Sequence, residues 1–185
     1  ANLVQDIQRL AVGLALDAND LPLARRWLDL HHRWSGFMNA TVGRAEGEVA
    51  EAEWHRAAGD PDRARVHAEH ALAYATSPRQ PLALLAAHRA LGILATDEGA
   101  FESADSHFSQ SLALADACRA PYERSLTLLA CAELAMATGE FTAATVAIDE
   151  VRAICTPMHA RPALAHAERL AARIAQSDLS GTAHR

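Results

Sequence analysis

The feature that most constrains the fold of this chain is a set of helix breaks that recurs with a fixed period. The three glycines Gly59, Gly99 and Gly139 are equally spaced, since 99−59 and 139−99 are both 40, and Asn19 occupies the position one period earlier. Glycine and asparagine are the residues that most readily adopt the left-handed backbone conformation that ends a helix. Because self-similarity at a fixed period is the signature of repeat proteins, the spacing predicts four copies of one structural unit.

Side chains of a fixed type follow each break. An apolar residue or proline stands two residues after it, an alanine five residues after it, and an apolar residue nine residues after it. The four copies contain, in this order, Leu21, Ala24 and Leu28; Pro61, Ala64 and Ala68; Phe101, Ala104 and Phe108; and Phe141, Ala144 and Ile148. Residues at these spacings share one face of a helix. The pattern predicts that a second helix starts after each break and docks through the alanine, with the larger side chains on either side.

Start and stop signals divide the chain into an all-α succession of helices. Asp60-Pro61 combines an N-cap acid with a proline at the first helical position, and further prolines separate the copies. The helices are expected near 2–17, 21–36, 40–58, 61–76, 81–98, 101–118, 121–138, 141–155 and 161–176. These form four helical hairpins (2–36, 40–76, 81–118 and 121–155) and a capping helix (161–176). Residues 177–185 are expected to be a disordered tail or linker.

Composition excludes several classes of protein. Half of the residues are hydrophobic, so the chain can bury a core, and a net charge of −6 argues against direct nucleic-acid binding. No apolar run has the length of a membrane span. The three cysteines lack disulfide or zinc-finger spacing, which suits a reducing, cytoplasmic compartment. The chain begins with Ala1 and not with methionine, so it is either a piece of a longer protein or has lost its start.

The segment HRALGILATDEGAFESADSHFSQSL resembles the tetratricopeptide signature. Leu91-Gly92 match its leucine-glycine pair, Gly99 its turn, and Phe101, Ala104 and Phe108 its later conserved-type positions. The 40-residue period is longer than the usual repeat of about 34 residues, and His88 stands at the tryptophan position. The resemblance implies an α-solenoid that winds as a right-handed superhelix.

The segments PYERSLTLLACAELAMATGEF and ARPALAHAERLAARIA look like the superhelical domain of large ATP-binding LuxR-type bacterial transcription regulators. That resemblance implies a non-catalytic domain that senses an effector or a protein partner. It also implies an ATPase module before this domain and a DNA-binding module after it. The chain itself has no phosphate-binding loop, so no nucleotide or other cofactor is expected. The alternative is a free-standing tetratricopeptide adaptor that binds a peptide or a partner protein.

The same family geometry places the first helix of each hairpin along the concave groove. By register, the groove-facing charged residues are Glu46, Glu53, Arg56, Arg89 and Glu133. Arg89 and Glu133 interrupt strongly apolar helices, and a charge there must face water or a ligand because burying it alone is costly. We expect a small-molecule effector or a protein partner in this groove.

Trp27 and Trp34 lie seven residues apart on the second expected helix. They are either core residues of the first hairpin or an exposed end surface that docks the preceding module.

Neither the histidines nor the cysteines make a catalytic or metal site by sequence alone. His67 and His70 are three residues apart and His31 and His32 are adjacent, but two ligands do not form a site. The sequence places no base beside Cys118. Cys131 and Cys155 occupy apolar positions of the expected helices, which is typical of buried free thiols. We therefore expect no enzyme activity and no metal.

Overall fold

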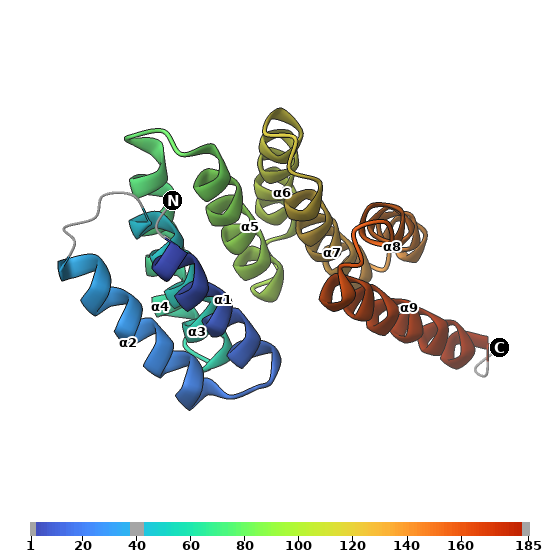
Figure 1. The fold of residues 1–185 in the computed structure, drawn as a ribbon. Helices are drawn as coiled ribbons and strands as arrows, with labels where there is room; N and C mark the ends of the chain where they lie inside the picture. The colour runs from blue at the N-terminus through green and yellow to red at the C-terminus, as the bar shows by residue number, and fades with distance from the viewer. Residues whose placement is uncertain (1–2, 38–42, 183–185) are drawn as a thin grey trace. The chain divides into compact units, whose positions relative to one another are not determined.

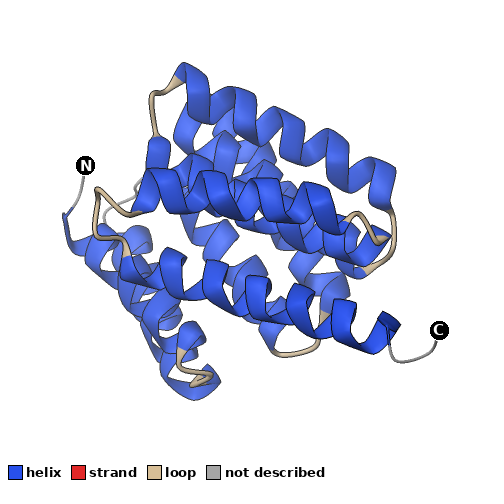
Figure 2. Ribbon diagram, turned by 90° about the vertical axis from the view of Figure 1, so that its right-hand side faces the viewer, coloured by secondary structure: helices blue, strands red, loops and turns tan. Residues whose placement is uncertain are grey.

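The computed structural model describes residues 3–37 and 43–182, and these residues form helices joined by short turns, with no strand among them (Figures 1 and 2). The helices are α1 (Leu3–Asp17), α2 (Leu21–Phe37), α3 (Arg44–Ala57), α4 (Pro61–Thr76), α5 (Pro81–Asp97), α6 (Phe101–Ala117), α7 (Pro121–Thr138), α8 (Phe141–Cys155) and α9 (Arg161–Thr182). The chain divides into two compact units, Ala1–Leu94 and Ala95–Arg185, here called the N-terminal and C-terminal units. Among the described residues, no helix is both long and apolar enough to cross a membrane.

The left-handed turns confirm the period seen in the sequence. Gly59, Gly99 and Gly139 have φ values of 79°, 75° and 81°, and Asn19 has a φ of 56°. A side chain at these three glycines would meet no neighbouring atom, so backbone conformation alone favours glycine there. Each turn is closed by a hydrogen bond from the residue after it to a carbonyl five residues back, as in Asp60 N to His55 O at 2.9 Å.

The small residue of each copy packs as predicted. Ala24, Ala64, Ala104 and Ala144 are all fully buried, and the positions four residues later are at most 2% exposed. The position two residues after the break does not behave as expected, because Pro61 is exposed and Phe101 is 38% exposed. That side chain lies at the very start of its helix and does not complete the predicted clamp in every copy.

The N-terminal unit is built from small side chains. The hairpin of α1 and α2 buries Val12, Ala15, Ala24 and Leu28, together with Ala50 of α3. The hairpin of α3 and α4 receives α5 through an alanine-rich cluster formed by Ala52, Ala64, Ala68, Ala90, Leu91 and Leu94. Alanine lets helix axes approach closely, so the helices lie near enough for long polar side chains to bridge them.

The C-terminal unit has a larger and continuous apolar core. Helices α7, α8 and α9 contribute Leu128, Leu129, Ala132, Ala135, Ala144, Ile148, Val151, Cys155, Ala163, Ala167, Leu170 and Ile174. The predicted capping helix therefore does pack on the preceding hairpin.

Two helix boundaries differ by more than one residue from those predicted. Helix α3 begins at Arg44, and the predicted start near residue 40 lies outside the described residues. Helix α9 continues to Thr182, beyond its predicted end near residue 176, and the role of residues 177–185 as a tail or linker stays a prediction. No proline follows Pro162, and the polar residues of this segment lower helix propensity only slightly.

Candidate ligand site on helices α2 and α3

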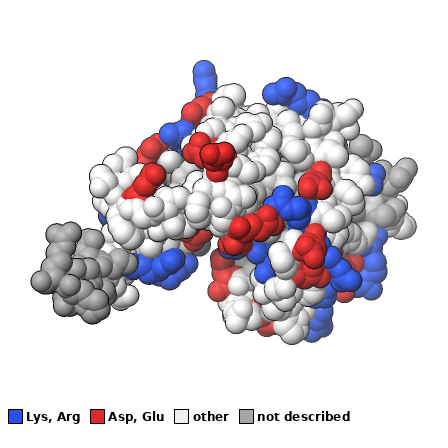
Figure 3. All heavy atoms as spheres, turned by 180° about the vertical axis from the view of Figure 1, so that it is seen from behind, with Lys and Arg blue, Asp and Glu red and all other residues white. Residues whose placement is uncertain are grey.

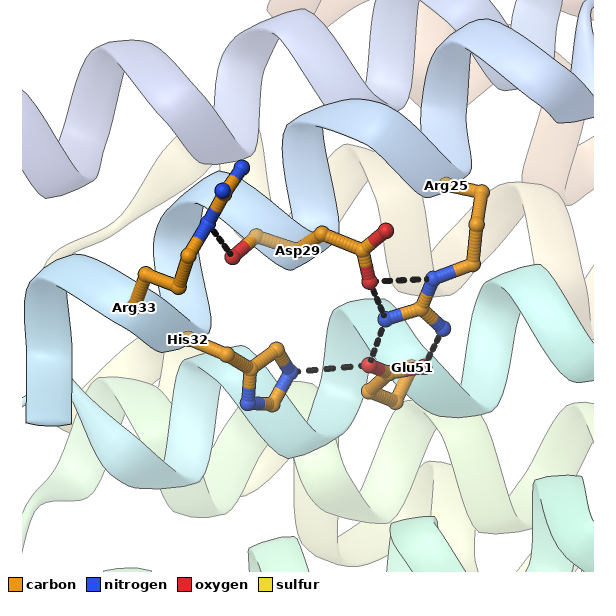
Figure 4. Close-up of a pocket in the computed structure, with 5 residues that line it drawn as sticks. All are labelled: Arg25, Asp29, His32, Arg33 and Glu51. Carbon is orange, nitrogen blue, oxygen red and sulfur yellow. Dashed lines mark hydrogen bonds and ion pairs between the residues drawn. The ribbon is translucent and has the colours of Figure 1, made fainter.

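A pocket open to solvent lies where α2 packs on α3 in the N-terminal unit (Figure 4). Arg25, Asp29, His32 and Arg33 line it from α2, and Glu51 lines it from α3. The four α2 residues are spaced by three, four or one positions, which places them on one face of the helix. The pocket volume of about 590 Å³ falls within the usual range for small-molecule sites.

Glu51 is the centre of the hydrogen-bond network in this pocket. Its side chain is 5% exposed, and both of its oxygens accept hydrogen bonds from Arg25, each at 2.7 Å. Asp29 binds the same guanidinium group at 2.8 Å, and His32 Nε2 lies 2.8 Å from Glu51 Oε1. Figure 4 shows Arg25 held between the two carboxylates. This planar, bidentate arrangement is the strongest form of ion pair.

The network holds its members in the charged form. Burial by itself would raise the pKa of Glu51, but hydrogen bonds from His32 and Arg25, and their charges, outweigh burial and lower that pKa to about 2. The hydrogen bond to Glu51 raises the pKa of His32 above its ordinary value, and the same partner raises that of Arg25. Glu51 is therefore ionised at neutral pH and is not a general acid or base.

Arg33 is the exposed cation of the pocket. Its Nε donates a 3.3 Å hydrogen bond to the backbone oxygen of Asp29. The terminal nitrogens have no other hydrogen-bond partner among the described residues. Arg33 is exposed, and Figure 4 shows its guanidinium group directed away from His32 and Glu51. A guanidinium group presented in this way can grip a carboxylate or a phosphate with two parallel hydrogen bonds.

A second polar cluster joins α3 to α4. His67 Nδ1 lies 2.7 Å from Glu48 Oε2, and His70 Nδ1 lies 3.8 Å from the same oxygen. The ring of His55 stacks on that of His67, with centroids 5.1 Å apart and planes 11° apart. Burial, and then the neighbouring His67, lower the pKa of His55.

Sequence reasoning missed both clusters, although a signal for the second was present. In an antiparallel hairpin, residues at equal distances from the turn lie side by side. Glu48 and His70 stand equally far from Gly59 along the chain, on either side of it, and so do Glu51 and His67. A comparison of acids on one helix with histidines at the same distance from the turn on the other helix would have matched these residues.

The five predicted groove residues lie outside this pocket. Glu46, Arg89 and Glu133 are half-buried, whereas Glu53 and Arg56 are exposed on α3. Glu46 has one buried carboxylate oxygen with no hydrogen-bond partner among the described residues. Glu133 binds His166 of α9 at 2.9 Å, so this charge joins the last hairpin to the capping helix. Their role in a groove stays a prediction.

The two predicted end-surface tryptophans are both half-buried. Trp27 packs against the Val12 cluster of the first hairpin. Trp34 has a buried indole nitrogen with no partner among the described residues, and its ring contacts Phe37, which is 82% exposed. A larger apolar surface lies on α1, where Leu3, Ile7, Leu10 and Leu14 are 52–71% exposed.

The thiol of Cys131 is not an activated nucleophile. Cys118 and Cys131 are half-buried, Cys155 is buried, and none of them is in a disulfide. Burial raises the pKa of Cys131 to about 11, so its thiol is protonated at neutral pH. On the face shown in Figure 3, basic and acidic side chains are interspersed and the basic ones form no continuous field.

Comparison with known proteins places this fold among tetratricopeptide-like helical repeats. No family model matches the chain, and no curated protein matches its sequence. A solved signal transduction ATPase with numerous domains (STAND) from Pyrococcus horikoshii, which has a tetratricopeptide repeat sensor, matches 88% of this chain with a TM-score of 0.60 and 13% identity. This chain spans 26% of that protein's length.

A second solved structure matches over the full length of both chains. It is a Podospora anserina protein described as a kinesin light chain with nearly identical TPR-like repeats, and it has a TM-score of 0.58 and 15% identity. The all-α repeat fold predicted from the sequence is therefore confirmed.

Proposed function

We propose that this chain is a non-catalytic sensor domain of a LuxR-type bacterial transcription regulator, and that it binds an effector in the pocket on α2 and α3. The observation that carries the proposal is this pocket, in which ion pairs fix Arg25 while Arg33 stays available at the edge. The fold supports it, because the STAND protein that this chain resembles has a tetratricopeptide repeat sensor. Such a regulator acts in the cytoplasm.

The residues of the pocket define the chemistry of the effector. Arg33 would bind a carboxylate or phosphate group, and Asp29 and His32 would accept or donate hydrogen bonds to hydroxyl or amine groups. Because the lining comes from two helices, a bound effector would favour the arrangement in which α2 and α3 are packed as they are here. Binding would thus shift the conformational equilibrium of the domain toward this arrangement. Such a shift would transmit the binding signal to a neighbouring module.

In this proposal the flanking modules are an ATPase and a DNA-binding domain. The exposed apolar residues of α1 recur at positions 3, 7, 10 and 14, which is the spacing of a helix face that packs on another helix. We propose this face, together with the Trp34 and Phe37 edge, as the surface that docks a helix of the preceding module. The DNA would be bound by the other module and not by this chain.

The alternative is a free-standing adaptor, which the full-length match to the kinesin light chain repeats supports equally. The flanking coding sequence separates the two proposals. The regulator requires a phosphate-binding loop upstream and a helix-turn-helix downstream, whereas the adaptor requires neither.

A thermal-shift screen against sugars, nucleotides, amino acids and short peptides tests the effector site. We expect at least one anionic compound to raise the Tm of the wild type, and Arg33→Ala to abolish that shift. Arg26→Ala is the matched control, because Arg26 is an exposed arginine on the same helix outside the pocket. A shift that survives in Arg33→Ala would reject the pocket.

Two further variants test the predicted groove. A shift lost in Arg89→Ala or Glu133→Ala, but kept in Arg33→Ala, would move the site to the groove. If no compound shifts the Tm, the effector proposal fails and a protein partner is favoured. The α1 face would then be tested by replacing Leu10 with glutamate in a pull-down with the flanking module.

A further inference from the structure

Three potential metal ligands converge between α3 and α4, outside the pocket described above. Glu48 comes from α3, and His67 and His70 come from successive turns of α4. One carboxylate oxygen of Glu48 and one ring nitrogen of each histidine all lie within 4.8 Å of one another. We propose that these three side chains form a binding site for a divalent transition-metal ion, with zinc as the representative ion. This departs from the expectation, based on sequence alone, that the chain binds no metal.

The distances between the ligand atoms fit such an ion. Zinc binds histidine nitrogen and carboxylate oxygen at about 2.0–2.1 Å, which places neighbouring ligands of a tetrahedral site about 3.4 Å apart. Glu48 Oε2 lies 2.7 Å from His67 Nδ1 and 3.8 Å from His70 Nδ1. These two separations therefore need to change by less than about 1 Å to admit the ion, and the two histidine nitrogens lie within 4.8 Å of each other.

The ligand set also indicates the class of metal. Two imidazoles and one carboxylate favour zinc, copper, nickel or cobalt over magnesium and calcium, which prefer oxygen ligands alone. The side chains of Glu48, His67 and His70 are 18%, 28% and 55% exposed. The site is thus reachable from solvent, and water would fill the remaining coordination position.

A neighbouring set of Glu51, His55 and His67 is a poorer candidate. The rings of His55 and His67 are stacked with planes only 11° apart, and an imidazole lone pair lies in the plane of its ring. One ion cannot lie in both of these nearly parallel planes. Glu51 is moreover already bound by Arg25 and His32. Because His67 belongs to both sets, we expect one ion per chain.

The consequence of binding would be a cross-link between the two helices of one hairpin. Glu48 and His70 stand on opposite sides of the Gly59 turn in the sequence, and the ion would close the loop between them. Binding energy contributed to the folded state only would stabilise the N-terminal unit. This inference is independent of the proposed effector pocket, since it uses none of the residues that line it.

Titration calorimetry of the full chain with ZnCl₂, after treatment with a chelator, tests the site. We expect one zinc ion per chain and a rise in Tm, with no comparable rise in MgCl₂. His70→Ala should weaken binding at least about tenfold, and it should fold because His70 is more than half exposed. Glu48→Gln should weaken binding similarly while keeping the shape of the side chain.

His166→Ala is the matched control. His166 also lies 2.9 Å from a glutamate, Glu133, but no third ligand accompanies that pair in the described residues. We expect zinc affinity to be unchanged in this variant. Cobalt(II) substitution adds a spectroscopic control, because a site without cysteine gives no thiolate charge-transfer band.

Several results would overturn the proposal. They are the absence of zinc binding to the wild type, equal affinity in His70→Ala and the wild type, and a thiolate band with cobalt. Loss of binding in His55→Ala but not in His70→Ala would assign the ion to the neighbouring set instead.

Discussion

At the scale of single residues, Glu51 shows how a helical repeat adds buried charge to the apolar contact between successive hairpins. Its carboxylate is buried on α3, while the side chains that compensate it, Arg25 and His32, reach across from α2. A buried carboxylate is tolerated only when charged hydrogen-bond donors surround it. The close approach of alanine-rich helices brings these donors within reach.

Arg25→Ala tests this arrangement. It leaves Glu51 buried with only His32 as a close partner, and it should lower the free energy of unfolding by about 2–3 kcal/mol, since Arg25 is itself one-third exposed. Urea denaturation measures the change, and Arg26→Ala should alter stability by less than about 0.5 kcal/mol. Equal stability of the two variants would show that the ion pair contributes nothing.

Glu51 also makes stability depend on pH. Its pKa in the folded state, about 2, lies below the ordinary value of 4.5, so its contribution is present above pH 4.5 and is lost as the pH falls toward 2. The pKa of His32 is raised from 6.5, so its contribution is full below 6.5 and is lost as the pH rises past its folded-state pKa.

The stability difference between the wild type and Glu51→Gln should therefore be largest between pH 4.5 and 6.5. It should become smaller as the pH rises past the folded-state pKa of His32, where the imidazole is neutral but Arg25 still pairs, and it should be smallest near pH 2. Urea titrations of both proteins across this range measure it. A difference that does not vary with pH would contradict the assignment.

A substitution at Gly47 tests the packing of α3 against α2. A methyl group on Gly47 would lie 2.8 Å from Nε2 of His31, which is only 2% exposed, so the closely packed surroundings would have to shift. Gly47→Ala should therefore cost about 1–3 kcal/mol of stability. Gly13→Ala is the control within α1, where the methyl group would meet nothing within 4 Å and should add about 0.5–1 kcal/mol. The opposite order of the two Tm values would refute this.

At the scale of helices, the caps vary from copy to copy although the turns do not. Asp20 and Asp60 each accept a hydrogen bond from the backbone of the third residue that follows, at 2.9 Å and 3.1 Å. The equivalent positions one and two periods after Asp60 are Ala100 and Glu140, which make no such bond. The first turns of α6 and α8 therefore have uncapped amide groups.

Exchanging the caps tests this difference. Asp60→Ala should destabilise the protein by about 1 kcal/mol, and Ala100→Asp should stabilise it by about 0.5–1 kcal/mol. Both changes are read from denaturant midpoints. If Ala100→Asp lowers stability, the backbone before α6 cannot accept a cap despite its similar φ and ψ values.

The helices could be predicted from sequence because their ends depend on local chemistry. The φ-positive turns at Gly59, Gly99 and Gly139 set the boundaries of six helices almost to the residue. The end of α9 could not be predicted in this way, because neither proline nor a turn glycine marks it until after residue 180.

The candidate site depends on contacts between helices, so much less of it could be predicted. Glu51 meets Arg25 only once α2 has packed on α3, and nothing within either helix fixes that register. Arg89 and Glu133 were chosen because a charge interrupts an apolar helix, but Glu133 has a nearby histidine, His166, that sequence spacing did not reveal. Interhelical partners explain such charges as readily as ligands do.

At the scale of the whole molecule, the two units have different kinds of core. The C-terminal unit buries branched side chains such as Ile148, Val151 and Leu170 in one continuous cluster. The N-terminal unit distributes its burial over smaller, alanine-rich clusters. Larger buried side chains remove more apolar area from water, so local stability should differ between the units.

Hydrogen exchange measures this difference directly. Amides in α7 and α8 should exchange more slowly than those in α1 and α2, whose outer face exposes large apolar side chains. Saturating zinc should slow exchange in α3 and α4 if the proposed metal site exists. Uniform protection across all the helices would instead indicate one cooperative core.

The turns at Gly99 and Gly139 have nearly the same backbone conformation, with φ values of 75° and 81°, and they lie one period apart. A segment of one period, cut between equivalent points of these turns, begins and ends in the same geometry, so its ends can be joined to those of another copy without a linker. Gene duplication or deletion by whole periods would therefore lengthen or shorten such an array while every junction kept a conformation already present in the chain. The same property offers the protein engineer a module that can be added in units of two helices, such as α6 with α7.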